Sequence, residues 1–531
     1  MDIQMEGADF NNVRRFLIFG RTDGSYFVAN DENTDSFNDH VDCIKRLISN
    51  EQGLHVVDII KQTSVENRAP RRSPLIYALA LCAKSSDKQT KNAAYRSLVE
   101  VCRLPTHLFK FIKFTEILSG DHKGWGRAQR KGVSEWYNQN NFLQNPLKLL
   151  KLGCKYRRRS KFNHKDVIRL GHIKPANQHV AFAIRYLVKG KKHLSDFDTN
   201  DVVINTAFQF VLGLERIRAL STDDTSQLCE LIKRYRFSHE HIPTPYLTSK
   251  EVWECLVFTM PLTALIRHLG KLSKLGLLDP GELQEKHVID KIRNPDVVNC
   301  ARIHPFSLLT AWNSYKRGYS GPHRRLVWVV NPRIANALEN AFYNSLSYVR
   351  PTGSRILLAI DGSNTMLQQP AHGMPEISAR SAAVATVFAI YKIETQGNGL
   401  GQAEMVLLLD TVTPIAINTH RDDLESASQK FSVHGTGSNH NPCKAIEWAL
   451  ENGKEFDAFV LFNVSGTSLV NSARQYRESM NKPHCRFVSV SMTSNNYNVT
   501  DPLDSDMLNV VGLDSKAVSL ILDFIRNGGI E

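Results

Sequence analysis

Several features that mark common protein classes are missing from this chain of 531 residues. No apolar run reaches the roughly 18 residues that a membrane-spanning helix needs, so we expect no membrane association. The first residues, Met1–Glu6, are acidic and lack the apolar core of a signal peptide. Nine cysteines are scattered without paired spacing, which favours free thiols in a reducing compartment. These absences predict a cytoplasmic protein that is in part nuclear.

Motifs of the common enzyme classes are missing as well. The sequence has no G-x-x-x-x-G-K-[ST] phosphate loop and no G-x-S-x-G nucleophile elbow. It also lacks a carboxylate cluster of the kind that two-metal nucleases use. We therefore expect a binding protein and not an enzyme.

Charge is distributed unevenly along the chain, which has a formal net charge of +13. Residues 351–531 contain 13 Lys+Arg and 19 Asp+Glu, a net charge of −6. Residues 1–350 contain the remaining 53 Lys+Arg and 34 Asp+Glu, a net charge of +19. A basic surplus of this size indicates a polyanionic partner, and that partner should bind the first part.

Residues 1–350 have the periodicity of consecutive amphipathic helices. Apolar residues between Ala94 and Cys102 follow the spacing of one helical face, and Pro105 separates them from a second periodic run that ends at Ile117. Further runs begin near Val252 and after Pro261. No clean repeat period is visible, so this pattern favours a solenoid of degenerate HEAT-like repeats, with a compact all-α domain as the alternative.

Residues 351–531 have a different pattern, in which apolar runs alternate with helical stretches. The expected strands lie at 356–360, 405–409, 458–462 and 487–490, and the expected helices at 378–393, 443–450, 472–480 and 516–526. Alternating strands and helices predict a parallel sheet covered on both faces. The fold class is therefore multidomain, all-α followed by α/β, with a boundary near residue 350.

A basic segment, residues 148–174, contains ten Lys+Arg and one acid, Asp166, with aromatic and imidazole rings between them. Cations bind phosphates, and rings stack on bases or donate hydrogen bonds, so the segment favours an RNA or DNA site, with a solvated charged face as the alternative. Within the segment, Asn163 and Asp166 predict a helix start, and Val167, Ile168 and Leu170 should form its buried side. The candidate RNA-binding residues are Lys155, Arg157, Arg158, Arg159, Lys161, His164, Arg169, His172 and Lys174, together with Arg127 from a similar mixture around Trp125 and Trp136, two residues expected in the core.

A candidate metal site follows the first expected strand of the second part. Asp361 leaves this strand, and the hydroxyls of Ser363 and Thr365 follow at +2 and +4. Three hard oxygens suit Mg²⁺, and the loop 434–438 can supply another hydroxyl. The alternative is an Asp that caps the next helix.

Ordered matches along nearly the whole chain resemble the Ro sixty-kilodalton (SS-A) ribonucleoprotein autoantigen family, which is defined by the TROVE module. The matching stretches are Arg15–Gly20, Glu100–Phe109, Trp125–Ala128, His164–Asp166, Arg169–Pro175, Ser249–Trp253, Met260–Leu265, Ala301–Phe306 and Met492–Asn495. The resemblance implies a TROVE module at residues 11–350, a ring of HEAT-like helices. It also implies a von Willebrand factor A-like domain at residues 351–531.

The resemblance further implies that Y RNA stems bind the outer basic surface and that single-stranded 3′ ends of misfolded small noncoding RNAs enter a central hole. The Y RNA-binding cations of the family fall on Lys155 and Arg159, and its essential histidine falls on His172. Such a protein acts in small-RNA quality control. We expect a monomer with protein partners at the A-like domain.

The metal-ion-dependent adhesion site of the family is degenerate in this sequence. Thr365 replaces a serine, and the family's loop threonine matches Thr436, but Gly437 stands where an acid follows it. Val464 replaces the family's later aspartate. Since a full negative charge is lost, Mg²⁺ or another divalent cation should bind weakly. The rival hypothesis for the whole protein is a metal-dependent adhesion scaffold, which would purify with little RNA.

Overall fold

The computed structural model of the chain describes residues 2–28, 37–120, 124–156, 158–221, 224–320, 325–396, 402–418, 421–437, 441–493 and 499–527. It divides into two compact units. One unit contains residues 41–288, and the other contains residues 1–40 together with 289–531. Among the described residues, no helix combines the length and the apolar character that crossing a bilayer requires.

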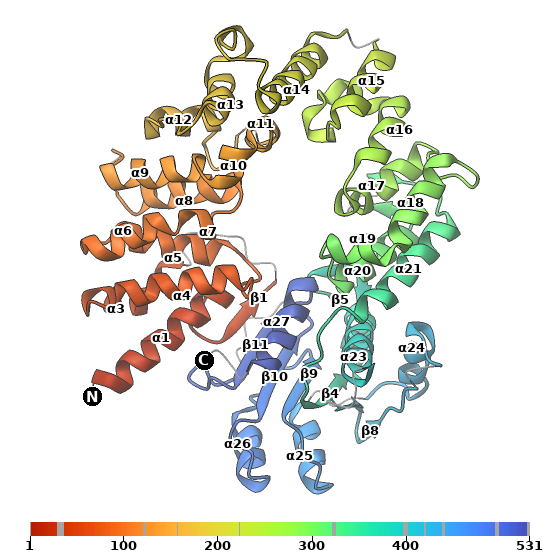
Figure 1. Cartoon of the computed structure of the whole chain (residues 1–531). Coiled ribbons are helices and arrows are strands. Elements are labelled where there is room, and N and C mark those ends of the chain that lie inside the picture. The colour runs from red at the N-terminus through yellow and green to blue at the C-terminus, as the bar shows by residue number, and fades with distance from the viewer. Residues whose placement is uncertain are drawn as a thin grey trace. The chain divides into compact units, whose positions relative to one another are not determined.

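The unit of residues 41–288 consists of short helices that pack on their neighbours in the sequence. Figure 1 shows α3 to α9 in successive layers, in which α4 packs on α3, α5 and α6, and α8 packs on α5. The helices are α3 (Asp42–Ser49), α4 (Gly53–Val65), α5 (Ser73–Ala83), α6 (Lys88–Arg96), α7 (Leu98–Val101), α8 (Pro105–Ile117), α9 (Arg127–Tyr137), α10 (Asn140–Gln144), α11 (Pro146–Lys155), α12 (His164–Gly171), α13 (Gln178–Lys189), η1 (Lys191–His193), α14 (Val202–Ala219), α15 (Thr225–Tyr235), η2 (His239–His241), η3 (Thr244–Thr248), α16 (Lys250–Thr259), α17 (Leu262–Lys274) and α18 (Leu283–Arg293), which extends past its end.

The periodic runs of the sequence become the buried faces of these helices. Ala94, Tyr95, Leu98, Val101 and Cys102 are all buried as predicted, but the helix is interrupted at Ser97 between α6 and α7. Pro105 occupies the first turn of α8, where its missing N–H costs no hydrogen bond. The periodicity therefore predicted burial correctly and the helix boundary less well.

The second unit contains a seven-stranded sheet with the order β1-β11-β10-β9-β4-β7-β8, parallel except for β8 (Figure 1). Its elements are α1 (Asp2–Phe19), β1 (Ser25–Phe27), α19 (Pro295–Cys300), α20 (Pro305–Lys316), β2 (Tyr319–Ser320), β3 (Leu326–Val327), α21 (Pro332–Leu346), β4 (Arg355–Asp361), α22 (Asn364–Gln368), β5 (Pro370–Ala371), β6 (Met374–Ser378), α23 (Ala379–Gln396), β7 (Gln402–Leu408), β8 (Val412–Pro414), α24 (Leu424–Val433), α25 (Cys443–Glu451), β9 (Ala458–Asn463), α26 (Val470–Ser479), β10 (Arg486–Ser491), β11 (Met507–Val511) and α27 (Ser515–Arg526). The four predicted strands and four predicted helices are confirmed within a few residues.

Three strands of this sheet, β1, β8 and β11, were not predicted. β11 extends the sheet beyond β10, and β1 adds from the far N-terminus by pairing Ser25 with Asn509 and Phe27 with Val511. The Arg15 guanidinium of α1 donates to the backbone carbonyls of Pro502 and Asp504. Residues 1–40 are therefore structurally part of the unit that holds the sheet.

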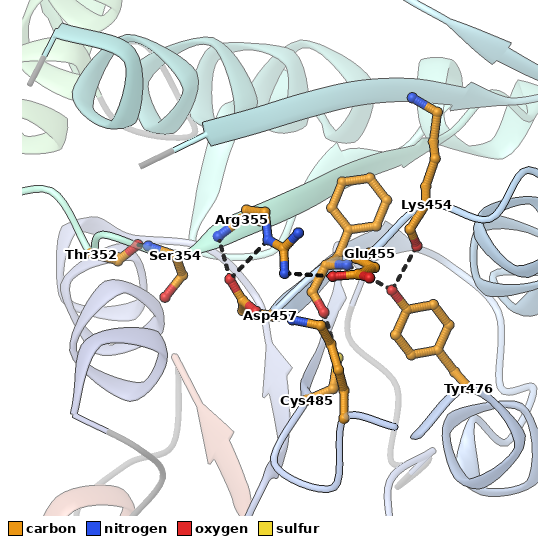
Figure 2. Close-up of polar contacts among 10 residues, drawn as sticks. Thr352, Ser354, Arg355, Lys454, Glu455, Asp457, Tyr476 and Cys485 are labelled. Atoms are coloured by element: carbon orange, nitrogen blue, oxygen red, sulfur yellow. Dashed lines mark hydrogen bonds and ion pairs between the residues drawn. The ribbon is translucent and has the colours of Figure 1, made fainter. Parts of the chain in front are cut away.

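The amino ends of β4 and β9 are fixed by polar contacts (Figure 2). The Arg355 side chain donates to Glu455 Oε2 at 2.9 Å, and its backbone N–H donates to Asp457 Oδ2 at 2.9 Å. The Tyr476 hydroxyl of α26 donates to the Lys454 carbonyl at 2.9 Å. These contacts fix the alignment of the two strands at their amino ends. The carboxyl ends of β4 and β9 therefore lie together at the opposite edge of the sheet.

Candidate nucleic-acid interface

The helix of the basic segment begins as the sequence predicts. The Asn163 side chain accepts the Asp166 N–H at 2.9 Å, and Asp166 accepts the Asn163 N–H at 3.3 Å, which together form a capping box. Val167 and Ile168 are buried as predicted, whereas the prediction for Leu170 is wrong because it is 44% exposed. Gly171, four residues after Val167, takes the buried position in its place.

A tight turn before this helix directs cations into solvent. Arg159 and Phe162 exchange two backbone hydrogen bonds of 2.9 Å, with Ser160 and Lys161 between them. Both central residues have positive φ, 50° and 72°, as a two-residue turn of the I′ type requires. Arg158, Arg159 and Lys161 are consequently exposed around one turn.

His172 lies at the end of α12, in the left-handed conformation with φ 47° and ψ 47°. It is exposed, and so are Arg169 before it and Lys174 after it. Asn138 fixes the backbone that follows, because its amide donates to the Lys174 carbonyl at 3.1 Å and accepts the Ala176 N–H at 2.8 Å. The imidazole of His172 therefore faces solvent, with Arg169 and Lys174 as the neighbouring cations. Hydrogen bonds with Asn138 fix the backbone that follows it.

Lys155 ends α11 and is already partnered within the protein. Its Nζ lies 2.8 Å from Glu240 Oε1, and both side chains are half-buried. Burial tends to raise the pKa of Glu240, but the hydrogen bonds from Lys155 and Ser238 outweigh it and lower this pKa to about 2. An RNA phosphate at Lys155 must therefore compete with an ionised carboxylate.

His164 needs a correction, because its side chain belongs to the core. The residue is 3% exposed, and its Nδ1 is hydrogen-bonded to the Tyr137 hydroxyl at 2.8 Å. Its ring also contacts Phe109 edge to face, with centroids 5.0 Å apart. Burial lowers the pKa of His164 to about 3, so the ring is neutral and has no exposed edge to offer RNA.

Arg127 begins α9 and is exposed, and α9 packs against α12. Trp125 and Trp136 are buried as predicted, and the Trp136 indole donates to the Cys102 carbonyl at 2.6 Å. Arg157 lies outside the described residues. Seven candidates are thus exposed on two packed helices and the adjoining turn, namely Arg127, Arg158, Arg159, Lys161, Arg169, His172 and Lys174.

Sequence reasoning missed two residues that shape this interface. Glu240 lies 85 positions after Lys155, and no local pattern connects them. Asn138 follows the last residue of α9, and no sequence pattern indicates that its amide bonds to the backbone of Lys174, 36 residues further on. Both act through tertiary contacts, which periodicity and composition cannot predict.

The candidate metal residues lie at the carboxyl edge of the sheet. Asp361 ends β4, its Oδ1 accepts the Ser363 N–H at 2.9 Å, and both residues are buried. Ser363 Oγ is buried and has no hydrogen-bond partner among the described residues, as expected of a hydroxyl that faces a cation. Thr365 is half-buried in α22, and Thr436 is exposed on the loop that follows α24. The Gly437 N–H donates to the Gly362 carbonyl at 3.2 Å, which brings this loop to the edge.

Close packing explains the glycine at 437. A Cβ at this position would lie 2.8 Å from Leu409 Cα, a distance that side chains do not tolerate against a backbone. An acid cannot replace Gly437 without moving the loop. The structure thus gives a steric reason for one departure from the family's metal motif.

A buried guanidinium, which the sequence analysis did not identify, stands beside this edge. Arg380 of α23 is 4% exposed, and it donates to the Gly435 carbonyl at 3.0 Å and the Phe431 carbonyl at 2.6 Å. Burial lowers the pKa of Arg380, while the charge of Asp361 raises it. Arg380 therefore holds the loop and also supplies positive charge to the carboxylate that a metal would need. The residues present fit a weak divalent site at most.

Two protein-family models match consecutive parts of the chain. The TROVE domain family matches residues 2–320, and the Ro60 vWA domain family matches residues 355–525. Two similar proteins are each called RNA-binding protein RO60. The one from Caenorhabditis elegans is 28% identical and covers 98% of this chain and 88% of its own length, and the one from Deinococcus radiodurans is 28% identical and covers 98% and 93%.

A solved structure is similar along almost the whole chain. The crystal structure of the Deinococcus radiodurans Ro (RSR) protein matches with a TM-score of 0.84 at 26% identity, and covers 98% of this chain and 100% of that one. The two named relatives are RNA-binding proteins.

Proposed function

This chain belongs to the TROVE-domain family of Ro RNA-binding proteins, and from that premise we propose that its basic segment binds structured small RNAs of the Y RNA class. RNA binding itself is the property shared with the named relatives. The observation that carries the finer proposal is the exposed set of six cations and His172 on α9, α12 and the turn at 159–162.

The chemistry of this set suits a duplex stem. Cations around a single turn neutralise consecutive phosphates, and binding then releases condensed counterions. His172 adds a group that can form hydrogen bonds or stack on a base. The backbone of His172 is fixed at the end of α12, and its ring is exposed to solvent. We place the Y RNA stem on Arg158, Arg159, Lys161, Arg169 and Lys174, with His172 as a contact on which specificity depends.

We extend the proposal to small-RNA quality control. In this role the protein scaffolds Y RNA and also takes single-stranded 3′ ends of misfolded small noncoding RNAs, in the central hole that the family resemblance implies. The two RNA classes then bind at different places, so a variant of the basic segment should weaken Y RNA more than a single-stranded 3′ end.

The test is a binding titration with His172→Asn. Asparagine tolerates the left-handed conformation, so this variant should fold normally. We expect Y RNA affinity to fall at least about tenfold, or roughly 1.4 kcal/mol. The matched control is His434→Asn, which removes an exposed histidine from the other unit and should leave the affinity unchanged. A folded His172→Asn protein with normal Y RNA affinity would contradict the proposed site.

We also propose weak divalent-cation binding at the carboxyl edge. Asp361 and Ser363 would hold Mg²⁺, with Thr365 and Thr436 as further hydroxyl ligands. Val464, half-buried after β9, contributes no oxygen ligand from its side chain. The affinity should be low because one carboxylate serves two cations, the metal and Arg380.

A further inference from the structure

Two cysteines from neighbouring helices lie close together within the unit of residues 41–288. Cys229 belongs to α15 and Cys255 to α16, and the two helices pack against each other. The two side chains are close enough for each to influence the pKa of the other. Cys229 Sγ also lies 3.4 Å from the carbonyl oxygen of Glu251. That carbonyl is one helical turn before Cys255, so the Cys229 sulfur is placed against the turn that carries Cys255.

The surroundings of the pair favour one thiolate. The neighbouring thiol of Cys229 lowers the pKa of Cys255 to about 7, although burial opposes this, and the thiol of Cys255 raises the pKa of Cys229. Lys233, one turn after Cys229, stabilises the negative charge, while Glu251 and Glu254 oppose it. The lowered pKa of Cys255 therefore assigns the thiolate to this residue.

Solvent reaches the two thiols from the side of Cys229. Cys229 is half-exposed, whereas Cys255 is 7% exposed. A small oxidant can therefore approach the pair, and a larger one is excluded from Cys255. Cys82 and Cys300 differ from this pair, because Cys82 is fully buried with its pKa raised to about 12, and Cys300 is exposed on α19.

We propose that Cys229 and Cys255 are a reversible oxidation site, at which hydrogen peroxide forms a disulfide that joins α15 to α16. The Cys255 thiolate attacks one peroxide oxygen, the O–O bond breaks, and the departing hydroxide takes a proton to become water. Cys229 then attacks the resulting sulfenic acid, the S–O bond breaks, and a second water leaves with the thiol proton. Two electrons pass from the thiols to the peroxide. Two molecules of a small thiol return them by exchange through a mixed disulfide and leave as a disulfide of their own.

The experiment uses the full-length, reduced protein after removal of RNA. The protein is treated with limited hydrogen peroxide, blocked with N-ethylmaleimide, digested without reductant and analysed by mass spectrometry. We expect two blocked thiols per chain to be lost and one cross-linked peptide pair, Cys229 with Cys255, to appear. Dithiothreitol should reverse both changes. In denaturing urea the selectivity for this pair should disappear, because it depends on the packing of α15 on α16.

Three variants separate the steps. Cys229→Ser should stop Cys255 at the sulfenic acid, which dimedone traps, and Cys255→Ser should abolish the disulfide. Cys300→Ser is the matched control, since it removes the more exposed thiol and should leave the loss of two thiols unchanged. The proposal is overturned if a peroxide dose that oxidises Cys300 leaves Cys229 and Cys255 reduced, or if Cys255 pairs mainly with another cysteine.

Discussion

The basic segment and the carboxyl edge of the sheet place arginine in opposite surroundings. Arg158, Arg159 and Arg169 are exposed around a turn and a short helix, where a polyanion can reach them. Arg380 is buried, donates to the carbonyls of Phe431 in α24 and Gly435 in the following loop, and lies near the Asp361 carboxylate of its own unit. The same side chain is free to meet a partner from solvent in one place and is a structural counter-ion in the other. The difference lies in burial, which composition alone does not show.

Reversing the exposed charges should give the largest effect. Replacing Arg158, Arg159 and Lys161 by Glu removes three phosphate contacts, so we expect Y RNA affinity to fall at least about 100-fold at physiological salt. The slope of log K against log salt should shrink by about 0.9 for each lost contact. Filter binding over a salt series measures both quantities. The control variant replaces Arg421, Arg474 and Lys516, three exposed cations of the other unit, by Glu. An equal loss in both variants would mean that net charge, and not this segment, determines binding.

Replacing the buried histidine should change stability and its pH dependence. His164→Gln breaks the contact with Tyr137, so we expect about 1–3 kcal/mol lower stability at pH 7. Because the pKa of His164 is about 3 in the folded protein and about 6.5 when unfolded, the unfolded chain binds the extra proton between these values. The wild type should therefore lose up to about 1.4 kcal/mol per pH unit below pH 6.5 through this group, and the variant should not.

Urea midpoints at pH 7 and pH 5 test this prediction. The difference in urea midpoint between the wild type and His164→Gln should become smaller as the pH falls. A gap that stays constant would show that His164 is not buried as a neutral ring. RNA affinity of the folded variant at pH 7 should be close to that of the wild type, since the ring does not face solvent.

Introducing an acid at the carboxyl edge of the sheet should change Mg²⁺ affinity, by less than the charge reversals change RNA affinity. Val464→Asp adds a negative charge beside Asp361, so Mg²⁺ affinity should rise about tenfold, equivalent to roughly 1.4 kcal/mol. Val464→Asn is the control of similar size without the charge. Calorimetric titration of the three proteins compares them directly. Equal affinities would mean that position 464 does not reach the metal.

The smallest effect is expected from the turn that exposes the cations. Ser160 has φ 50°, which costs a residue with a side chain about 1–2 kcal/mol. Ser160→Gly removes this cost and adds chain entropy to the unfolded state, so a net gain of about 0.5–1 kcal/mol is expected. The urea midpoint should rise while Y RNA affinity stays unchanged. A drop in affinity would indicate that the serine hydroxyl itself contacts RNA.

The sequence was most informative where the physics is local. The capping box at Asn163 and Asp166 and the buried strands of the sheet depend on neighbouring residues, and these predictions are confirmed. His164 could not be distinguished from His172 in this way, because both are histidines in the same basic segment and only tertiary packing buries one of them. Arg380 and Glu240 were missed for the same reason. Their partners lie 51 and 85 positions away along the chain.

The pairing of β1 with β11 has a consequence for synthesis of the protein on the ribosome. Ser25 and Asn509 are 484 residues apart, and both belong to the same sheet. At about 5–20 residues per second, strand β1 waits roughly 25–100 s for the strand that it pairs with. Helices α3 to α17, whose contacts are between near neighbours, can form during that time. A ribosome that stalls late should therefore hold a folded helical unit and an incomplete sheet, with the N-terminal strand available to proteases until the last helices are made.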